Sequence, residues 1–126
     1  MTIRYEGDTR FGECGVRAIA ALFRSHPEWI ELVANLKGVK NPEQGLNFFE
    51  CKKVINAVGK LLERRYRYVP NSVGLTYLQV VWLYYDGIVM FDEHLSFFRG
   101  WEVVDDWMSP EGMNDVPTGF WIRQPF

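Results

Sequence analysis

The sequence predicts a single α+β domain in which helices come first and an antiparallel sheet follows. Its 126 residues fit one domain of ordinary size, and 48% hydrophobic with 24% charged residues is the balance of a soluble globular protein. Apolar residues recur at helical spacing through the first half, whereas short β-branched and aromatic runs fill the second. No repeat, low-complexity tract or long linker divides the chain, so residues 1–126 are expected to form one domain.

The first third of the chain predicts a short strand and two helices. Residues 2–5 suit an opening strand. A helix is expected from Cys14, because one apolar stripe follows it, formed by Val16, Ile19, Ala20 and Phe23. Residues 25–28 (Ser-His-Pro-Glu) resemble a capping box with proline near the first helical position, which predicts a second helix that stops near Gly38. This interpretation assigns His26 to a helix cap.

A third helix is predicted after a loop at residues 41–45. Asn47, with Glu50 three residues later, repeats the capping signal and opens this helix. Its apolar stripe consists of Phe48, Cys51, Ile55 and Val58. Cys51 is therefore expected in the core.

The second half predicts a short helix among strands. Residues 61–69 alternate loosely and suit a strand, and Thr76 with Gln79 forms a further capping pair that opens a helix through Tyr84. Asp86 and Gly87 are expected to end that helix. Runs rich in β-branched and aromatic residues predict strands at residues 88–91, 95–98, 101–104 and 119–123.

Composition narrows the range of functions. The polar N-terminus and the absence of any apolar run near the roughly 20 residues that span a bilayer predict neither a secretory signal nor a membrane segment. Two cysteines are too few for a disulfide scaffold, which favours a cytoplasmic location. A net charge of −2 argues against nucleic acid as a partner. A basic run with interleaved tyrosines, residues 60–68, could follow phosphates, although a solvated strand face explains it as well.

Metal and cofactor chemistry find no support in the sequence. Its two histidines and two cysteines are widely separated and show no zinc-ligand spacing. No phosphate-cradling or dinucleotide-binding glycine motif occurs. We therefore expect neither a metal nor a cofactor.

Cys14 is the candidate nucleophile. Cysteine reacts as the thiolate, which the partial positive charge and free N–H groups of a helix N-terminus stabilise. Cys14 lies where a glycine-containing turn meets the first predicted helix, and Gly15 beside it would let a substrate backbone approach closely. A small buried side chain at a helix start is the alternative interpretation.

A predicted hairpin supplies a base and an acid. If Arg99 and Gly100 are its two loop residues, counting outward places His94 opposite Asp105, on one face of the sheet. The acid would then orient the imidazole while the other ring nitrogen faces a thiol. A slip of one residue would make Asp106 the partner instead. A surface loop is the alternative position for His94.

These residues resemble a known family. The order Cys14, His94, Asp105, with the cysteine opening a helix and the histidine on a later strand, is similar to the papain-like superfamily of cysteine peptidases. The Cys14-Gly15 pair resembles that of bacteriocin-processing leader peptidases. Residues 13–18 (Glu-Cys-Gly-Val-Arg-Ala) resemble more closely the N-E-C-S-V-R-A segment of short papain-like proteins of tailed bacteriophages. The resemblance spans residues 5–107.

The resemblance implies a catalytic triad of Cys14, His94 and Asp105 in a papain-like fold, with the cysteine helix first. Papain and the leader peptidases place a glutamine upstream of the cysteine as an oxyanion donor. Here no glutamine precedes Gln44, so Thr9 or Arg10 would have to take that role with the Cys14 amide.

The groove would use aromatic side chains, with Phe98 and Trp101 as its walls.

Two functions follow. The first is hydrolysis or acyl transfer at a peptide or isopeptide-like bond in a peptide or protein substrate, in the host cytoplasm if a phage encodes the chain. The second is a catalytically degenerate scaffold that binds a host protein. The aromatic content of 16% and the uneven charge favour such a surface, because residues 1–70 hold 12 of the 14 Lys and Arg.

Overall fold

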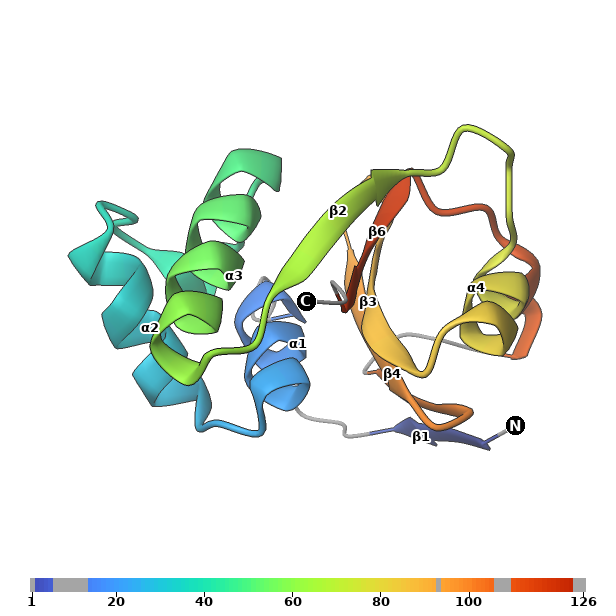
Figure 1. Ribbon diagram of the computed structural model, residues 1–126, viewed down its shortest axis with the longest axis horizontal. Coiled ribbons are helices and arrows are strands. Elements are labelled where there is room, and N and C mark those ends of the chain that lie inside the picture. Colours follow the sequence, from blue (N-terminus) through green and yellow to red (C-terminus); the bar gives the residue numbers. More distant parts are fainter. Residues whose placement is uncertain (1, 6–13, 93, 106–109, 124–126) are drawn as a thin grey trace.

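The computed structural model describes residues 2–5, 14–92, 94–105 and 110–123. Along these residues helices and strands follow one another as in Figure 1. The helical elements are α1 (Cys14–Phe23), α2 (Pro27–Leu36), the 3-10 turn η1 (Pro42–Gln44), α3 (Phe48–Leu62), α4 (Tyr77–Leu83) and the 3-10 turn η2 (Pro110–Asn114). The strands are β1 (Thr2–Tyr5), β2 (Tyr66–Pro70), β3 (Asp86–Met90), β4 (Leu95–Arg99), β5 (Glu102–Asp105) and β6 (Gly119–Arg123).

The strands form one sheet in the order β1-β5-β4-β3-β6-β2. Only the β1–β5 pair is parallel among the described strands, and the other four pairs are antiparallel. The predicted α+β class is therefore confirmed, with most of the helical part before the sheet. Two elements modify the simple order: β1 comes first and joins the far edge, and α4 lies between β2 and β3.

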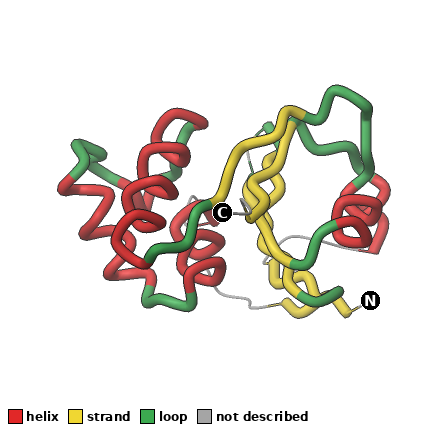
Figure 2. The backbone as a smooth tube through the Cα atoms, viewed as in Figure 1, coloured by secondary structure: helices red, strands yellow, loops and turns green. Residues whose placement is uncertain are grey.

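Helices cover both faces of the sheet. Helices α1, α2 and α3 lie on one side, and α4 with η2 lies on the other (Figures 1 and 2). Each face has its own buried cluster, and adjacent residues of a strand alternate between them. Phe97 belongs to the cluster under α1, whereas Phe98 belongs to the cluster under α4. Both faces of β4 are thus buried.

Local capping signals fix two helix starts as predicted. The Asn47 side chain accepts the Glu50 amide at 2.8 Å, and the Glu50 carboxylate accepts the Asn47 amide at 3.0 Å. Thr76 and Gln79 form the same reciprocal pair at the start of α4.

The predicted capping box at residues 25–28 is wrong. Position His26 is the N-cap of α2, and no side chain makes a capping hydrogen bond there. The reason lies in the preceding helix, because Ser25 completes its end. The Ser25 amide donates to Ala20 O and the Arg24 amide to Ala21 O, with Arg24 at φ 53°, which is a Schellman motif. The Ser25 hydroxyl donates to Phe23 O at 3.4 Å.

Several elements differ from prediction. Helix α3 continues to Leu62 and ends on Glu63 at φ 56°, so the strand expected from residue 61 begins at Tyr66. Asp86 and Gly87 do not end α4 but open β3, where the Gly87 backbone lies directly against the Trp121 carbonyl oxygen. The predicted loop at 41–45 contains the turn η1.

Candidate functional site

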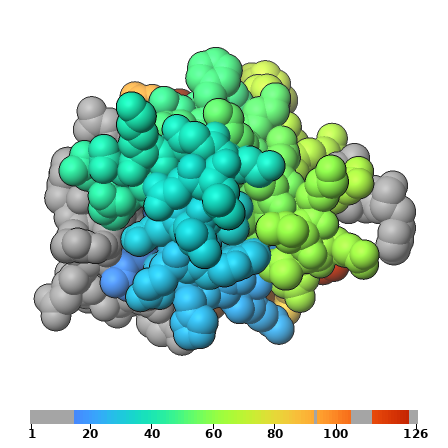
Figure 3. Space-filling model, turned by 90° about the vertical axis from the view of Figure 1, so that its left-hand side faces the viewer, coloured from blue at the N-terminus to red at the C-terminus, as the bar shows by residue number. Residues whose placement is uncertain are grey.

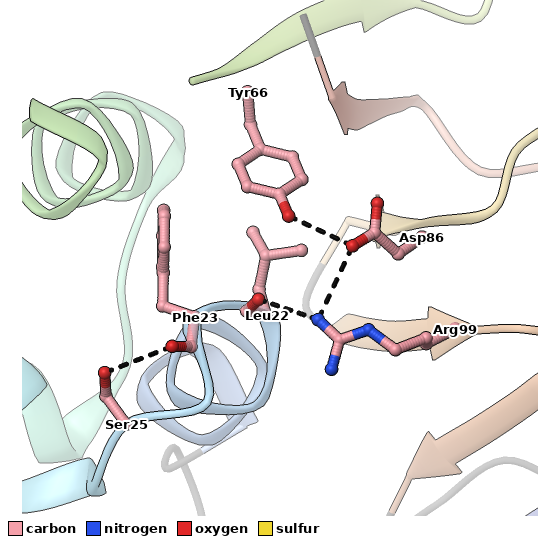
Figure 4. A network of polar contacts seen from close by, with 6 residues as sticks. All are labelled: Leu22, Phe23, Ser25, Tyr66, Asp86 and Arg99. Atoms are coloured by element: carbon pink, nitrogen blue, oxygen red, sulfur yellow. Dashed lines mark hydrogen bonds and ion pairs between the residues drawn. The ribbon is translucent and has the colours of Figure 1, made fainter. Parts of the chain in front are cut away.

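A polar contact at one end of β4 fixes the end of helix α1. Arg99 Nη2 donates to Leu22 O at 2.9 Å and lies 3.4 Å from Asp86 Oδ2 (Figure 4). The Tyr66 hydroxyl donates to the same Asp86 oxygen at 3.1 Å. The Arg99 guanidinium also lies 4.9 Å from the centre of the Phe97 ring, on the face that α1 covers. The last turn of α1 is therefore held at the end of β4.

The start of α1 consequently lies toward the start of β4. Residues along both elements, from Val16 to Leu22 and from Leu95 to Phe97, share one buried cluster. Their lengths match, because nine helical steps of about 1.5 Å and four strand steps of about 3.4 Å both give roughly 13.5 Å. Cys14 begins α1, and His94 immediately precedes β4. The fold brings these two positions to the same end of the sheet.

Asp105 belongs to that same end. Strand β5 runs antiparallel to β4, so it finishes where β4 begins. Strand β1 runs parallel to β5 and aligns Tyr5 with Asp105. From Tyr5 the chain passes to Cys14 through residues 6–13, which lie outside the described residues. Thr9 and Arg10, the predicted oxyanion donors, are among them.

The predicted hairpin register is wrong, because the turn lies one residue later in the chain than predicted. The loop residues are Gly100 and Trp101, at φ 56° and 69°, the left-handed pair of a type I′ turn. Arg99 pairs with Glu102, so it belongs to the strand and not to the turn. The contacts of Arg99 with α1 and Asp86 account for this, because they require its side chain on the face of the sheet that α1 covers.

The observed register changes the relation between His94 and Asp105. Phe97 aligns with Val104, and extending this register by one step sets Ser96 opposite Asp105. Along the backbone, His94 therefore lies two residues beyond the position opposite Asp105, as a diagonal neighbour. Such neighbours have Cα atoms about 7–8 Å apart. Asp106, the predicted alternative partner, lies outside the described residues.

His94 is half-buried and its Nδ1 atom is shielded from solvent. Its carbonyl oxygen accepts the Phe91 amide at 2.8 Å and closes the β3–β4 hairpin. Phe91 packs against the cluster under α4, and Leu95 belongs to the cluster under α1. Alternation along the strand thus places His94 on the α4 face. A contact between His94 and a thiol at Cys14 has to be made around the end of β4.

The prediction for Cys51 and the prediction for Gly15 have different outcomes. Cys51 is fully buried and its Sγ lies 3.8 Å from Leu46 O, so its assignment to the core is confirmed. The space beside Gly15 is occupied by Leu46, whose side chain would lie 3.3 Å from a Cβ at this position. Gly15 therefore admits a core side chain, where the sequence predicted room for a substrate.

The predicted groove walls are wrong. Phe98 is 0% exposed and lies in the cluster under α4, because α4 covers the sheet face that the sequence left open. Trp101 lies in the hairpin turn, at the opposite end of β4 from His94. Its ring is 4.1 Å from that of Trp82.

Sequence reasoning missed an exposed apolar patch around this turn, which consists of Trp82, Leu83, Tyr85 and Trp101. Their side chains are 60%, 61%, 68% and 47% exposed. The Gly100 amide donates to Tyr85 O at 2.8 Å, which ties the turn to the segment after α4. Four adjoining apolar side chains at the surface are typical of interaction sites. The signal in the sequence was the Trp-Leu-Tyr-Tyr run of residues 82–85.

Sequence reasoning also missed a pocket of about 250 Å³ where α3 ends and β2 begins. Its lining consists of Ile55, Asn56, Gly59, Lys60, Arg65 and Tyr66. The basic run that the sequence places on one strand is divided by the fold: Lys60 belongs to α3, Arg65 to the following loop and Arg67 to β2. This division turns two of the cations toward a shared concave surface.

Burial raises the pKa of the Tyr66 phenol from 10.0 to about 12, and the charge of Asp86 and the hydrogen bond to it act in the same direction. The opposing effect of Arg123 and Arg99 is smaller. Tyr66 therefore stays protonated and donates to Asp86.

Within the described residues no three His, Cys, Asp or Glu side chains gather as a metal site would require. None of the described helices is long and apolar enough to cross a membrane. Comparison with protein families, curated proteins and solved structures gave no significant match.

Proposed function

We propose that this chain is a papain-like cysteine hydrolase that acts on a peptide or isopeptide-like bond. Cys14 is the nucleophile, His94 the base and Asp105 the residue that orients the imidazole. One observation carries the proposal: the start of α1, the start of β4 and the end of β5 lie at one end of the sheet, where Cys14 opens α1, His94 precedes β4 and Asp105 ends β5. If a phage encodes the chain, as the resemblance implies, the reaction would take place in the cytoplasm of a host cell.

The chemistry follows from these positions. His94 takes the thiol proton of Cys14, and the sulfur bonds to the carbonyl carbon of the substrate. The C–N bond then breaks, and the amine leaves with the proton from the imidazolium. Water, deprotonated by His94, hydrolyses the thioester and restores the thiol. The Cys14 amide at the helix start is one donor to the oxyanion, and Thr9 or Arg10 is the second.

Cysteine labelling tests this proposal with two internal controls. We expect iodoacetamide to alkylate Cys14 quickly with an apparent pKa well below about 8.5, while Cys51, which is 0% exposed, reacts slowly. His94→Ala should abolish the fast reaction. His26→Ala is the matched control, because His26 is exposed and its side chain makes no capping hydrogen bond. Equal, slow labelling of both cysteines in the wild type and in both variants would remove the case for an enzyme.

A second candidate function rests on the apolar patch. A degenerate scaffold that binds a host protein would use this surface, at the opposite end of β4 from His94. The test is a pull-down from host lysate with three baits. They are the wild-type chain, a Trp82→Ser, Trp101→Ser double variant, and Leu36→Ser on α2 as an exposed apolar control. A host protein retained by wild type and the control, and lost with the double variant, supports this function. Retention by all three baits contradicts it.

A further inference from the structure

The pocket at the end of α3 has an apolar floor and a basic rim. Ile55, Gly59 and Tyr66 are buried and form its floor, while the exposed side chains of Asn56, Lys60 and Arg65 surround its opening. Figure 3 looks onto this side of the molecule, where the green residues of α3 adjoin the yellow-green residues that lead into β2. The pocket thus opens on the side of the sheet that carries α1, α2 and α3.

The charge around this opening is positive. No carboxylate is among the lining residues. Neither Lys60 nor Arg65 forms a salt bridge with any residue in the described part of the chain. A third cation, Arg123, aligns with Tyr66 across the β2–β6 pair, and its charge lowers the pKa of the Tyr66 phenol.

The carboxylate that contacts Tyr66 in the pocket floor already has partners of its own. The Asp86 carboxylate accepts a hydrogen bond from the Tyr66 hydroxyl and faces Arg99, on the side of the sheet that α1 covers. Lys60 lies in the last turn of α3, where a cation complements the helix dipole, so helix stability accounts for one charge. Arg65 follows the helix, and neither the dipole nor an ion pair among the described residues explains its position beside Lys60.

We propose that this pocket binds a phosphate group, either free or as the monoester of a small molecule. A volume of about 250 Å³ is below the roughly 300–1,000 Å³ of pockets that enclose a drug-sized ligand, so one anionic group enters and any remainder stays outside. A phosphate monoester carries a charge of about −1.5 to −2 at pH 7, which matches two cations, whereas a carboxylate carries only −1. The fork of Arg65 suits two phosphate oxygens, and Lys60 and the Asn56 amide can donate to the others.

The test is a titration of the full chain at constant ionic strength, followed by NMR. Inorganic phosphate, methyl phosphate and acetate are the three probes, and the Asn56 side-chain amide and the Gly59 backbone amide are the reporters. We expect saturable shifts at these groups with the phosphates and not with acetate. Tighter binding of methyl phosphate identifies an ester as the ligand, and tighter binding of inorganic phosphate identifies the free ion.

Variants make the test specific. Lys60→Gln and Arg65→Gln should each weaken phosphate binding by about tenfold, the loss expected from one charge-assisted hydrogen bond. Lys52→Gln is the matched control, since Lys52 is an exposed lysine of the same helix outside the pocket. The proposal is overturned by equal weakening in all three variants, by an equal response to acetate, or by no shift at the reporters. Cys14 takes no part, so this result is independent of the hydrolase proposal.

Discussion

Removing one hydroxyl tests the polar network that joins the sheet to α1. Tyr66→Phe keeps the ring, which packs edge-on against Phe23 at 5.4 Å, and deletes only the donor to Asp86. Asp86 is 6% exposed, so its carboxylate loses a hydrogen bond that water does not fully replace. A hydrogen bond to a charged group contributes about 1.5–3 kcal/mol. In a domain of this size the midpoint of thermal unfolding should fall by roughly 5–12 °C.

The pKa of Tyr66 gives a second magnitude, which combines the burial of the phenol with its contact to Asp86. Because the pKa rises on folding from 10.0 to about 12, the protonated phenol stabilises the fold fully below pH 10, and this contribution is lost as the pH rises through 12. Two units correspond to about 3 kcal/mol. The stability difference between wild type and Tyr66→Phe should therefore be largest below pH 10 and decline above it.

The assay is urea unfolding of both proteins at several pH values from 8 to 11.5. Using the difference between the two proteins removes the titration of lysines and other tyrosines, which they share. Tyr68→Phe is the matched control, since its hydroxyl meets only Thr118 O, at 3.5 Å, among the described groups. It should cost little at any pH. A difference for Tyr66→Phe that stays constant from pH 8 to 11.5 would refute the assignment of this hydroxyl as the donor to Asp86.

Two further substitutions test the contacts that hold the sheet together and fix α1 to it. Arg99→Met keeps much of the side-chain volume but leaves the Asp86 carboxylate without its cation, so we expect the free energy of unfolding in urea to fall by about 3 kcal/mol. A fall below about 1 kcal/mol would mean that the contact with Leu22 O does not hold α1. Gly87→Ala places a Cβ against the Trp121 carbonyl of the neighbouring strand, so the variant should fail to give a cooperative thermal transition, whereas Gly74→Ala, at φ 75° with open space around it, should cost about 1 kcal/mol. A fully cooperative Gly87→Ala variant of wild-type stability would contradict the close approach of β3 and β6.

Two local capping signals predict the starts of α3 and α4 correctly, and long-range contacts explain the error at the hairpin turn. Asn47 with Glu50 needs only its own four residues to cap a helix, so the signal and the structure agree. The hairpin turn depends on Arg99, whose partner Leu22 lies 77 residues earlier in the chain. Nothing within the hairpin sequence indicates that contact. The hairpin sequence alone therefore predicts the turn one residue too early.

Burial of the second sheet face explains why Phe98 is not the groove wall that the sequence predicts. The alternation of β4 predicts one face in the core and does not say what covers the other. Helix α4 covers it, and Phe98 is buried as a result. For a related reason the sequence does not predict the pocket. Lys60 and Arg65 are neighbours only because α3 continues to Leu62 and reverses at Glu63, where the sequence suggested an uninterrupted strand.

Strand β4 is the element against which both helical layers are positioned, and this bears on the proposed catalytic site. On one face Arg99 holds the end of α1. On the other face the buried hydroxyls of Tyr77 and Ser96 lie 2.7 Å apart and anchor the start of α4 to the strand. His94 is two residues from Ser96 on that same face. In the proposed site, His94 would therefore follow a strand that is fixed from both sides, which is the rigidity that a thiol–imidazole pair requires.

Disturbing the α4 anchor should therefore change the reactivity of Cys14 through His94. Ser96→Ala removes the hydroxyl partner of Tyr77 without adding volume, and the Tyr77 hydroxyl keeps its contact with Phe97 O at 3.4 Å. The variant should still fold, at a cost of about 1–3 kcal/mol. If the strand positions the imidazole, the apparent pKa of Cys14 in the labelling experiment should rise toward its ordinary value of about 8.5. An unchanged labelling profile in the folded variant would show that the position of His94 does not depend on α4.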